Sequence, residues 1–287
     1  MYVRIDSTTD RFGRPLYSRP RGLRLSPLAM ALGIIALGVL LWTRPWAPRP
    51  AAAAAEEPLQ RADLAPRLGE AIPERYHGAI VSTPPPGFTE PVVALTFDDG
   101  PHPDVTAPIL DALSARGITA SFFMLGLQAE KYPDLAKRVA AEGHILANHS
   151  YAHRVHMSQA EAVLELDRAE ALIYRAAGDS PLLFRPPEGR TDTVLTQYAR
   201  DERFTIVQWS VDSEDWKHPP ADTIIANCME DLEPGSIVIL HDGGGGYPDT
   251  PKALPGLLDR IESEGYSFVT VPELLQAWDA HLSATGL

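Results

Sequence analysis

Short hydrophobic runs and longer amphipathic segments alternate along the chain between Pro91 and Leu282. The short runs are rich in β-branched and aromatic residues, and they predict strands at residues 92–97, 119–124, 145–147, 182–184, 205–210, 237–240 and 267–271. The longer segments repeat their apolar residues with a helical period, which predicts helices at residues 105–115, 133–141, 159–177, 222–232 and 252–264. Strands that alternate with helices in this way predict an α/β fold on a parallel sheet, either a β/α barrel or an open doubly wound sheet.

The N-terminal part of the chain follows different patterns. Residues 25–43 form an apolar run long enough to cross a membrane, which predicts a transmembrane anchor. Six arginines precede the run and two follow it, so the positive-inside rule predicts a cytoplasmic basic tail at residues 1–24 and an extracytoplasmic location for the chain after the run. Residues 44–90 are rich in proline and alanine, which is typical of a semi-rigid spacer. A cleaved signal peptide is the alternative to an anchor, because the alanines at residues 51–55 offer small-residue cleavage sites.

Charge is divided unevenly along the chain. Residues 1–50 carry eight arginines against Asp6 and Asp10, a net charge of +6, whereas the remainder carries −19, which together give −13. Binding of nucleic-acid phosphates requires clustered cations. The strongly acidic charge of residues 51–287 therefore argues against nucleic acid as a partner. The glycines at residues 243–246 lack the Lys-Ser/Thr pair of a phosphate-binding loop, so no nucleotide is expected. Cys228 is the single cysteine, which excludes an intramolecular disulfide and predicts a buried core thiol.

Polar side chains directly follow several of the predicted strands. They are Asp98 and Asp99, His149, Arg185, Asp212 and His241. In parallel α/β folds the carboxyl ends of the strands share one edge, where binding and catalytic sites are built. The sequence therefore predicts that these side chains converge on one site.

The residue types in this set suit a hydrolytic metal site. Asp98 and Asp99 place two carboxylates side by side, and His149 and His153 place two imidazoles at i and i+4, on one side of a helical turn. An Asp-His-His set leaves coordination positions open for water and substrate, which suits Zn²⁺ or another divalent first-row ion. The second carboxylate can then act as general base, and His241 can protonate the departing amine. Each motif alone has a plainer interpretation: a turn for the aspartates, a solvated helix for the histidine pair, and a core imidazole for His241.

Five motifs give the chain its resemblance to a known family. They are Thr96-Phe97-Asp98-Asp99-Gly100-Pro101, His149-Ser150-Tyr151-Ala152-His153, Phe184-Arg185-Pro186-Pro187-Glu188-Gly189, Asp212-Ser213-Glu214-Asp215-Trp216 and Ile239-Leu240-His241-Asp242. In this order they resemble the motifs of the NodB-like polysaccharide deacetylases, the family 4 carbohydrate esterases. The resemblance covers residues 91–282 and implies that this catalytic domain is a distorted (β/α)7 barrel. Together with the apolar run, the expected fold is this α/β barrel with one N-terminal transmembrane helix.

The resemblance also implies a role for individual motif residues. The catalytic residues would be Asp98 as general base, His241 as general acid, Arg185, which orients Asp98, and Asp215, which holds the tautomer and charge of His241. The metal ligands would be Asp99, His149 and His153. The substrate-binding residues would be Trp216 and Ile239, which line a pocket for the acetyl methyl group, and Glu188, whose backbone N–H helps to stabilise the oxyanion. Glu188 stands where the family commonly has tyrosine, a departure that bears on the choice of substrate.

The expected activity is removal of N-acetyl groups from an amino-sugar polysaccharide. Peptidoglycan, a chitin-like polymer and poly-N-acetylglucosamine all remain open as substrates, with Zn²⁺ as the expected cofactor and Co²⁺, Mn²⁺ or Ni²⁺ as alternatives. An O-acetyl polysaccharide esterase, such as an acetylxylan esterase, would use the same metal site. A non-catalytic envelope glycan-binding protein is a further alternative, and the presence of both Asp98 and His241 favours an enzyme over it.

Overall fold

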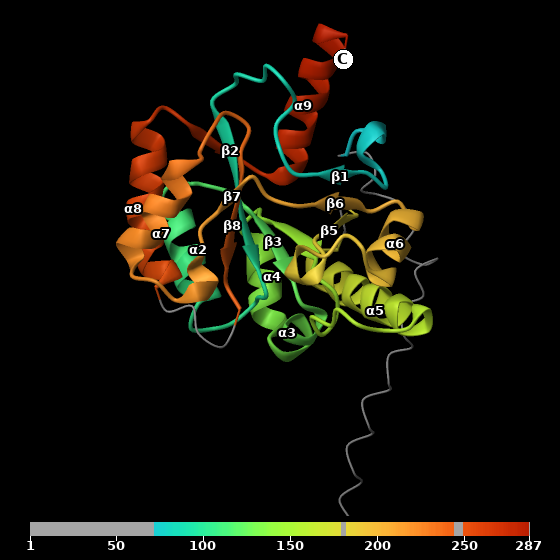
Figure 1. Ribbon diagram of the computed structural model, residues 1–287. Coiled ribbons are helices and arrows are strands. Elements are labelled where there is room, and N and C mark those ends of the chain that lie inside the picture. The colour runs from blue at the N-terminus through green and yellow to red at the C-terminus, as the bar shows by residue number, and fades with distance from the viewer. Residues whose placement is uncertain (1–71, 179–181, 244–248, 287) are drawn as a thin grey trace, which may run out of the picture. The chain divides into compact units, whose positions relative to one another are not determined.

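The computed structural model describes residues 72–178, 182–243 and 249–286, which form one α/β unit (Figure 1). The predicted basic tail at residues 1–24, the predicted anchor at residues 25–43 and the spacer up to residue 71 lie outside the described residues. No helix within the described ranges is both long and apolar enough to span a membrane.

A curled sheet of parallel strands forms the centre of the unit (Figure 1). Its strands are β1 (Ile80–Val81), β2 (Val92–Asp98), β3 (Ser121–Met124), β4 (Ile145–Asn148), β5 (Leu183–Phe184), β6 (Thr205–Val207), β7 (Val211–Asp212), β8 (Ile237–His241) and β9 (Ser267–Val269). They follow the order β1-β6-β5-β4-β3-β2-β8-β7, and β9 pairs with the first half of β2. Every residue of β2 is buried, as expected for a parallel strand covered on both faces.

Helices cover the sheet in two groups (Figure 1). One group consists of α2 (Thr106–Ser114), α7 (Ala221–Glu230) and α8 (Thr250–Ser263), and the other of α3 (Gly126–Lys131), α4 (Pro133–Ala141), α5 (Gln159–Ala177) and α6 (Val194–Asp201). The last helix, α9 (Val271–Thr285), packs near β2. Three short 3₁₀ helices complete the unit: η2 (Glu74–Tyr76), η3 (Pro187–Gly189) and η4 (Asp215–Lys217).

The predicted parallel α/β fold is confirmed. The described residues contain nine strands, whereas seven were predicted. All seven predicted strands occur, with ends shifted by a few residues, and two short strands, β1 and β7, are added. Each added strand has two residues, too few for a hydrophobic period to be recognised. Within the described residues β1 and β7 stand at opposite ends of the strand order and do not pair, so the sheet is a curled half-barrel rather than a closed seven-stranded barrel.

The folded unit begins before Pro91, where the predicted spacer ends. Backbone pairing of β1 with β6 brings residues 80–81 into the sheet, and four apolar side chains of the supposed spacer are buried against α9 and its surroundings: Ile72, Tyr76, Val81 and Phe88. The predicted spacer of residues 44–90 is therefore wrong for residues 72–90, because its proline content concealed these buried apolar positions. At the other end, α9 continues beyond residue 282 to Thr285.

Buried apolar residues from both faces of the sheet form the core. One cluster joins β2, β3 and β8 to α2, α4 and α8, and it includes the buried Cys228, as the sequence predicts. A smaller cluster joins α5 and α6 to Phe184 and Ile206. This packing fixes the strands so that their carboxyl ends share one edge of the sheet.

Candidate active site

A cavity of about 450 Å³ opens at the carboxyl ends of the strands. The residues that line it are Asp98, Asp99, His149, His153, Pro186, Glu188, Gly189, Trp209, Asp212, Trp216, Ile239 and His241. Eight of the ten predicted site residues are among them. The other two, Arg185 and Asp215, are buried directly behind the cavity wall, where each contacts one of the lining residues.

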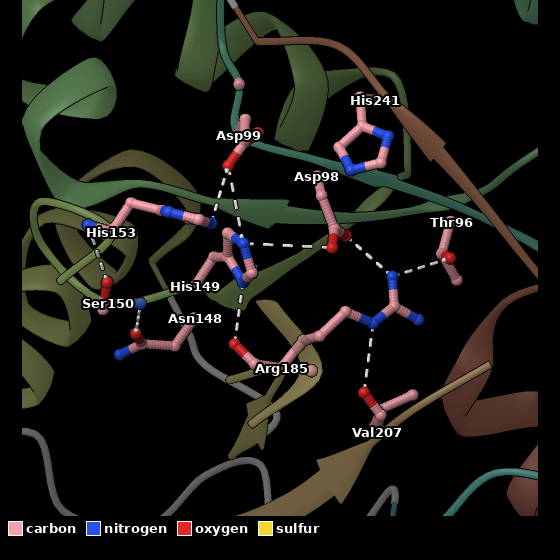
Figure 2. Close-up of polar contacts among 12 residues, drawn as sticks. Thr96, Asp98, Asp99, Asn148, His149, Ser150, His153, Arg185, Val207 and His241 are labelled. Atoms are coloured by element: carbon pink, nitrogen blue, oxygen red, sulfur yellow. Dashed lines mark hydrogen bonds and ion pairs between the residues drawn. The ribbon is translucent and has the colours of Figure 1, made fainter. Parts of the chain in front are cut away.

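Arg185 and Asp98 form a buried ion pair (Figure 2). Nη1 of Arg185 donates to Oδ1 of Asp98 at 2.7 Å and to the Thr96 hydroxyl at 2.9 Å. The same guanidinium donates to the carbonyl of Val207 and stacks 4.1 Å from the Phe123 ring. Because its N–H groups donate to fixed partners, the guanidinium holds one oxygen of Asp98 in place. Oδ2 of Asp98 lies 3.9 Å from Nε2 of His149, on the cavity side.

Asp99, His149 and His153 form a three-residue cluster (Figure 2). Oδ1 of Asp99 lies 3.4 Å from Nε2 of His149 and 3.6 Å from Nε2 of His153. All three atoms fall within 4.8 Å of one another, so one cation can reach them together. Burial alone would raise the pKa of Asp99, but the hydrogen bond and charge of His149 outweigh it and keep this pKa below its usual value.

The tautomer of His149 suits a ligand role. Its Nδ1 lies 2.7 Å from the carbonyl oxygen of Arg185, which can only accept, so Nδ1 carries the proton and donates. Loss of the ring's other proton therefore leaves the lone pair on Nε2, the atom that faces Asp99. Two imidazole nitrogens and one carboxylate oxygen form a donor set that fits a divalent ion such as Zn²⁺.

The backbone that carries these groups differs from the predicted helical turn. Residues 149–153 form a loop between β4 and α5, so the two imidazoles lie close together as predicted, but on a loop rather than on a helical turn. Asp99, Ser150 and His153 have φ values of 74°, 70° and 57°, in the left-handed region. Such conformations are costly for residues other than glycine and persist where surrounding contacts hold them.

His241 is held by Asp215 on the opposite side of the cavity. Nδ1 of His241 lies 2.6 Å from Oδ1 of Asp215, whose other oxygen accepts from the His241 backbone N–H and from the Thr250 hydroxyl, each at 2.8 Å. Burial would lower the pKa of His241, but the Asp215 hydrogen bond and charge overcome it and raise this pKa to about 9. The imidazole is therefore protonated near neutral pH, and His241 lines the cavity.

The remaining cavity wall is partly apolar and partly acidic. Ile239 is buried at its base, and Trp216 is 49% exposed at its rim. Glu188 is exposed, with φ 55° and ψ 20°, in the turn that follows β5. Trp209 and Asp212 also line the cavity. Sequence reasoning did not place Trp209 in the site, because no motif or spacing singles it out.

Asp242 lies beneath the two aspartates. Its carboxylate accepts from the Gly100 backbone N–H at 3.1 Å and from the Thr106 hydroxyl at 2.6 Å, and its side chain has no solvent exposure. Burial, with the nearby charges of Asp99 and Asp98, raises the pKa of Asp242 to about 7. Asp242 thus lies under the turn that presents Asp99.

These features define a hydrolytic site: a carboxylate held by Arg185 and an imidazole held by Asp215 face a shared cavity beside three side chains whose donor atoms suit a cation. Comparison with known proteins agrees with this class. A family model described as polysaccharide deacetylase matches residues 86–207. A peptidoglycan-N-acetylglucosamine deacetylase of Bacillus cereus is 38% identical over 192 residues, which are 66% of this chain and 70% of that protein.

Two further similarities extend the comparison. PdaC of Bacillus subtilis, a peptidoglycan-N-acetylmuramic acid deacetylase, is 33% identical over 201 residues, which are 68% of this chain and 42% of that protein. The crystal structure of the Bc1960 peptidoglycan N-acetylglucosamine deacetylase superimposes with a TM-score of 0.66 at 36% identity, and covers 70% of this chain and 94% of that one. The chain belongs to the polysaccharide deacetylase family, the NodB-like family 4 carbohydrate esterases. It is an enzyme that acts on carbon–nitrogen amide bonds other than peptide bonds.

Proposed function

We propose that the protein is a metal-dependent hydrolase that removes N-acetyl groups from an amino-sugar polysaccharide of the cell envelope, with peptidoglycan as the first candidate. The observation that carries this proposal is one cavity lined by Asp98, the Asp99-His149-His153 cluster and His241. A base, a cation site and an acid are therefore within reach of one acetamide group.

Asp99, His149 and His153 would hold the metal, for which Zn²⁺ is the first candidate. Their mixed nitrogen and oxygen donors, within 4.8 Å of one another, support this choice. When bound there, the ion supplies Lewis acidity toward the acetamide carbonyl and toward water.

The chain's own residues would carry the proton transfers. Asp98 would accept a proton from the attacking water through the oxygen not held by Arg185, since that ion pair orients the carboxylate. A carbon–oxygen bond forms at the carbonyl carbon, and the carbon–nitrogen bond then breaks. His241 would donate the Nε2 proton to the departing nitrogen, so that acetate and a free amino sugar result. Asp215 would stabilise the imidazolium before this transfer.

The cavity wall would bind the acetyl group and the oxyanion. Ile239 and Trp216 offer an apolar surface for the acetyl methyl group. The backbone N–H of Glu188 would contribute to oxyanion stabilisation, because a fixed amide donor is most effective where negative charge develops.

Peptidoglycan is favoured by the relatives. Two peptidoglycan deacetylases, one named for N-acetylglucosamine and one for N-acetylmuramic acid, resemble the chain at 38% and 33% identity. The experiment is to measure acetate release by the purified full chain, loaded with Zn²⁺, on peptidoglycan, chito-oligosaccharides and acetylated xylan. Release from the first two supports the proposal, whereas release from acetylated xylan alone would assign an O-acetyl esterase and overturn it.

The protein would be a single-pass membrane protein with its N-terminus in the cytoplasm and its catalytic domain outside. The support is the apolar run at residues 25–43 with six arginines before it. An anchor of this kind would hold the enzyme next to a fixed polymer. The test is a fusion after Leu287 to a reporter that is active only outside the cytoplasm. The fused reporter should be active. A cytoplasmic signal, or a mature protein that starts near residue 55, would contradict the anchored topology.

A further inference from the structure

Two glutamates on α5, Glu165 and Glu170, are buried and lie outside the catalytic set. They are 6% and 3% exposed, on a helix whose other inward-facing residues are apolar. Charged side chains are rarely buried in a core without specific partners. Both glutamates contact the segment that carries two candidate metal ligands: Glu170 bonds to Asn148 at the end of β4, and Glu165 bonds to the loop of residues 149–153.

Glu170 reaches His153 through two intermediate side chains. Oε2 of Glu170 accepts a hydrogen bond from Nδ2 of Asn148 at 3.1 Å, and Nδ2 also donates to the carbonyl of Leu166 on the same helix. Oδ1 of Asn148 then accepts from the Ser150 backbone N–H at 2.9 Å. The Ser150 hydroxyl oxygen in turn accepts from the His153 backbone N–H at 3.0 Å. Figure 2 shows the last two of these contacts beside the histidine rings.

Glu165 contacts the same loop at Ala152, one residue before His153. Its Oε2 accepts from the Ala152 backbone N–H at 2.8 Å, while Arg154 lies 4.0 Å from Oε1. Two consecutive backbone N–H groups of the loop, those of Ala152 and His153, are thus tied to α5 directly or through Ser150 and Asn148.

The loop needs such restraint. Ser150 and His153 both have positive φ, a conformation that non-glycine residues keep only when surrounding contacts enforce it. The contacts from α5 fall on the residues of the strained segment and include hydrogen bonds to a buried charge, which are stronger than neutral ones. Loss of these contacts would let the backbone of His153 relax and would move its imidazole away from Asp99.

We infer that Glu165 and Glu170 are positioning residues that set metal affinity by fixing the loop of His149 and His153. The inference rests on the proposed function, because it requires the cluster to bind a metal. Glu165 and Glu170 touch neither metal nor substrate, and act through the backbone of Ala152 and through Asn148.

The experiment compares Glu165→Ala and Glu170→Ala with Glu165→Gln and Glu170→Gln in the full chain. Zn²⁺ affinity is measured by competition with a chromophoric chelator, and the site geometry by the visible absorption spectrum of the Co²⁺-loaded protein. The alanine variants should bind Zn²⁺ about 10- to 100-fold more weakly, with an altered Co²⁺ spectrum, as is typical for the loss of groups that support ligands. The glutamine variants keep an acceptor oxygen and should stay within a few-fold of wild type.

Ile173→Val is the matched control, because Ile173 is a buried apolar residue of α5 that packs in the core cluster of β2, β3 and β8. It should lower the melting temperature of the metal-free protein and leave Zn²⁺ affinity unchanged. If the alanine variants fail to fold, Glu165→Asp and Glu170→Asp keep the charge but shorten the side chain, and the same loss of affinity is expected from them. Folded alanine or aspartate variants with wild-type affinity and spectrum would overturn the inference. A wild-type protein that binds neither Zn²⁺ nor Co²⁺ would instead overturn the proposed function.

Discussion

Nη1 of Arg185 lies 2.7 Å from Oδ1 of Asp98, and both side chains are buried. The pair places an oriented carboxylate at the end of β2, within the cavity that also contains the candidate cation ligands and His241. A buried charge that loses its partner is costly, so the two residues depend on one another. Asp98 therefore has a structural partner on one oxygen and an open cavity on the other.

The Asp98→Asn variant should lose activity and keep its metal. The amide retains the shape of the carboxylate but cannot accept a proton, and loss of a general base typically lowers kcat by about 10²- to 10⁴-fold. Metal content, measured by atomic spectroscopy, should equal that of wild type because Asp98 is outside the ligand set. Asp259→Asn, at an exposed carboxylate of α8, is the control. A variant that turns over at the wild-type rate would place the base elsewhere.

The Asp215→Asn variant should shift the alkaline limb of the kcat/KM profile to lower pH. Asp215 raises the pKa of His241 to about 9, above the ordinary value of 6.5, so in wild type the acid remains protonated up to that pH. The raised pKa also affects the free energy of unfolding. The His241–Asp215 pair stabilises the folded protein below pH 6.5, and this stabilisation is lost as pH rises toward 9. The check is a pair of kcat/KM profiles from pH 5 to 10. Superimposable alkaline limbs would show that His241 is not the acid.

Asp242 should make the metal-free protein less stable as pH rises from about 4 to 7. Its pKa is raised from 3.8 to about 7 in the fold, so folding favours the protonated form and this stabilisation is lost as the group ionises. Urea unfolding in the presence of chelator, at pH 5 and pH 8, should show a larger drop for wild type than for Asp242→Asn. Equal drops would mean that Asp242 titrates normally.

The Glu188→Gln variant should raise kcat/KM on glycans that carry an anionic group next to the scissile N-acetyl, such as a lactyl carboxylate. Glu188 is an exposed carboxylate that lines the cavity, so its repulsion is reduced by solvent and salt to about 1 kcal/mol or less, a gain of up to about fivefold. Neutral chito-oligosaccharides should respond little.

Glu188→Gly is the control for the backbone at this position, because glycine adopts the φ of 55° without strain and keeps the N–H donor. It should raise the rate on anionic glycans as the glutamine variant does. If charged and neutral substrates respond equally to both changes, Glu188 has no part in selectivity.

Sequence reasoning predicted the elements with strong local signals. The bounds of α5 agree with the prediction because Ser158 forms a capping box with Glu161 and Gly178 ends the helix in a left-handed conformation. The strand-end residues converge as predicted, since parallel strands end at one edge regardless of how many strands the sheet contains.

Other features depend on contacts between distant parts of the chain. The hydroxyl of Thr250 reaches Asp215 across 35 residues, and the carboxylate of Asp242 reaches Gly100 across 142 residues, which no local pattern indicates. Ser150 and His153 have a left-handed backbone that is held by side-chain contacts of Asn148 and Ser150, and the i, i+4 spacing does not indicate this loop, so the histidine pair was expected on a helical turn. β1 escaped prediction because tertiary burial, not composition, places it in the sheet.

The most direct test of the central claim is acetate release from N-acetylated peptidoglycan by the purified full chain before and after metal removal. Dialysis against a chelator should abolish release, and one equivalent of Zn²⁺ should restore it in wild type but not in His153→Ala, which lacks one of the three donors. Acetate release at the full rate by metal-free protein would contradict the account.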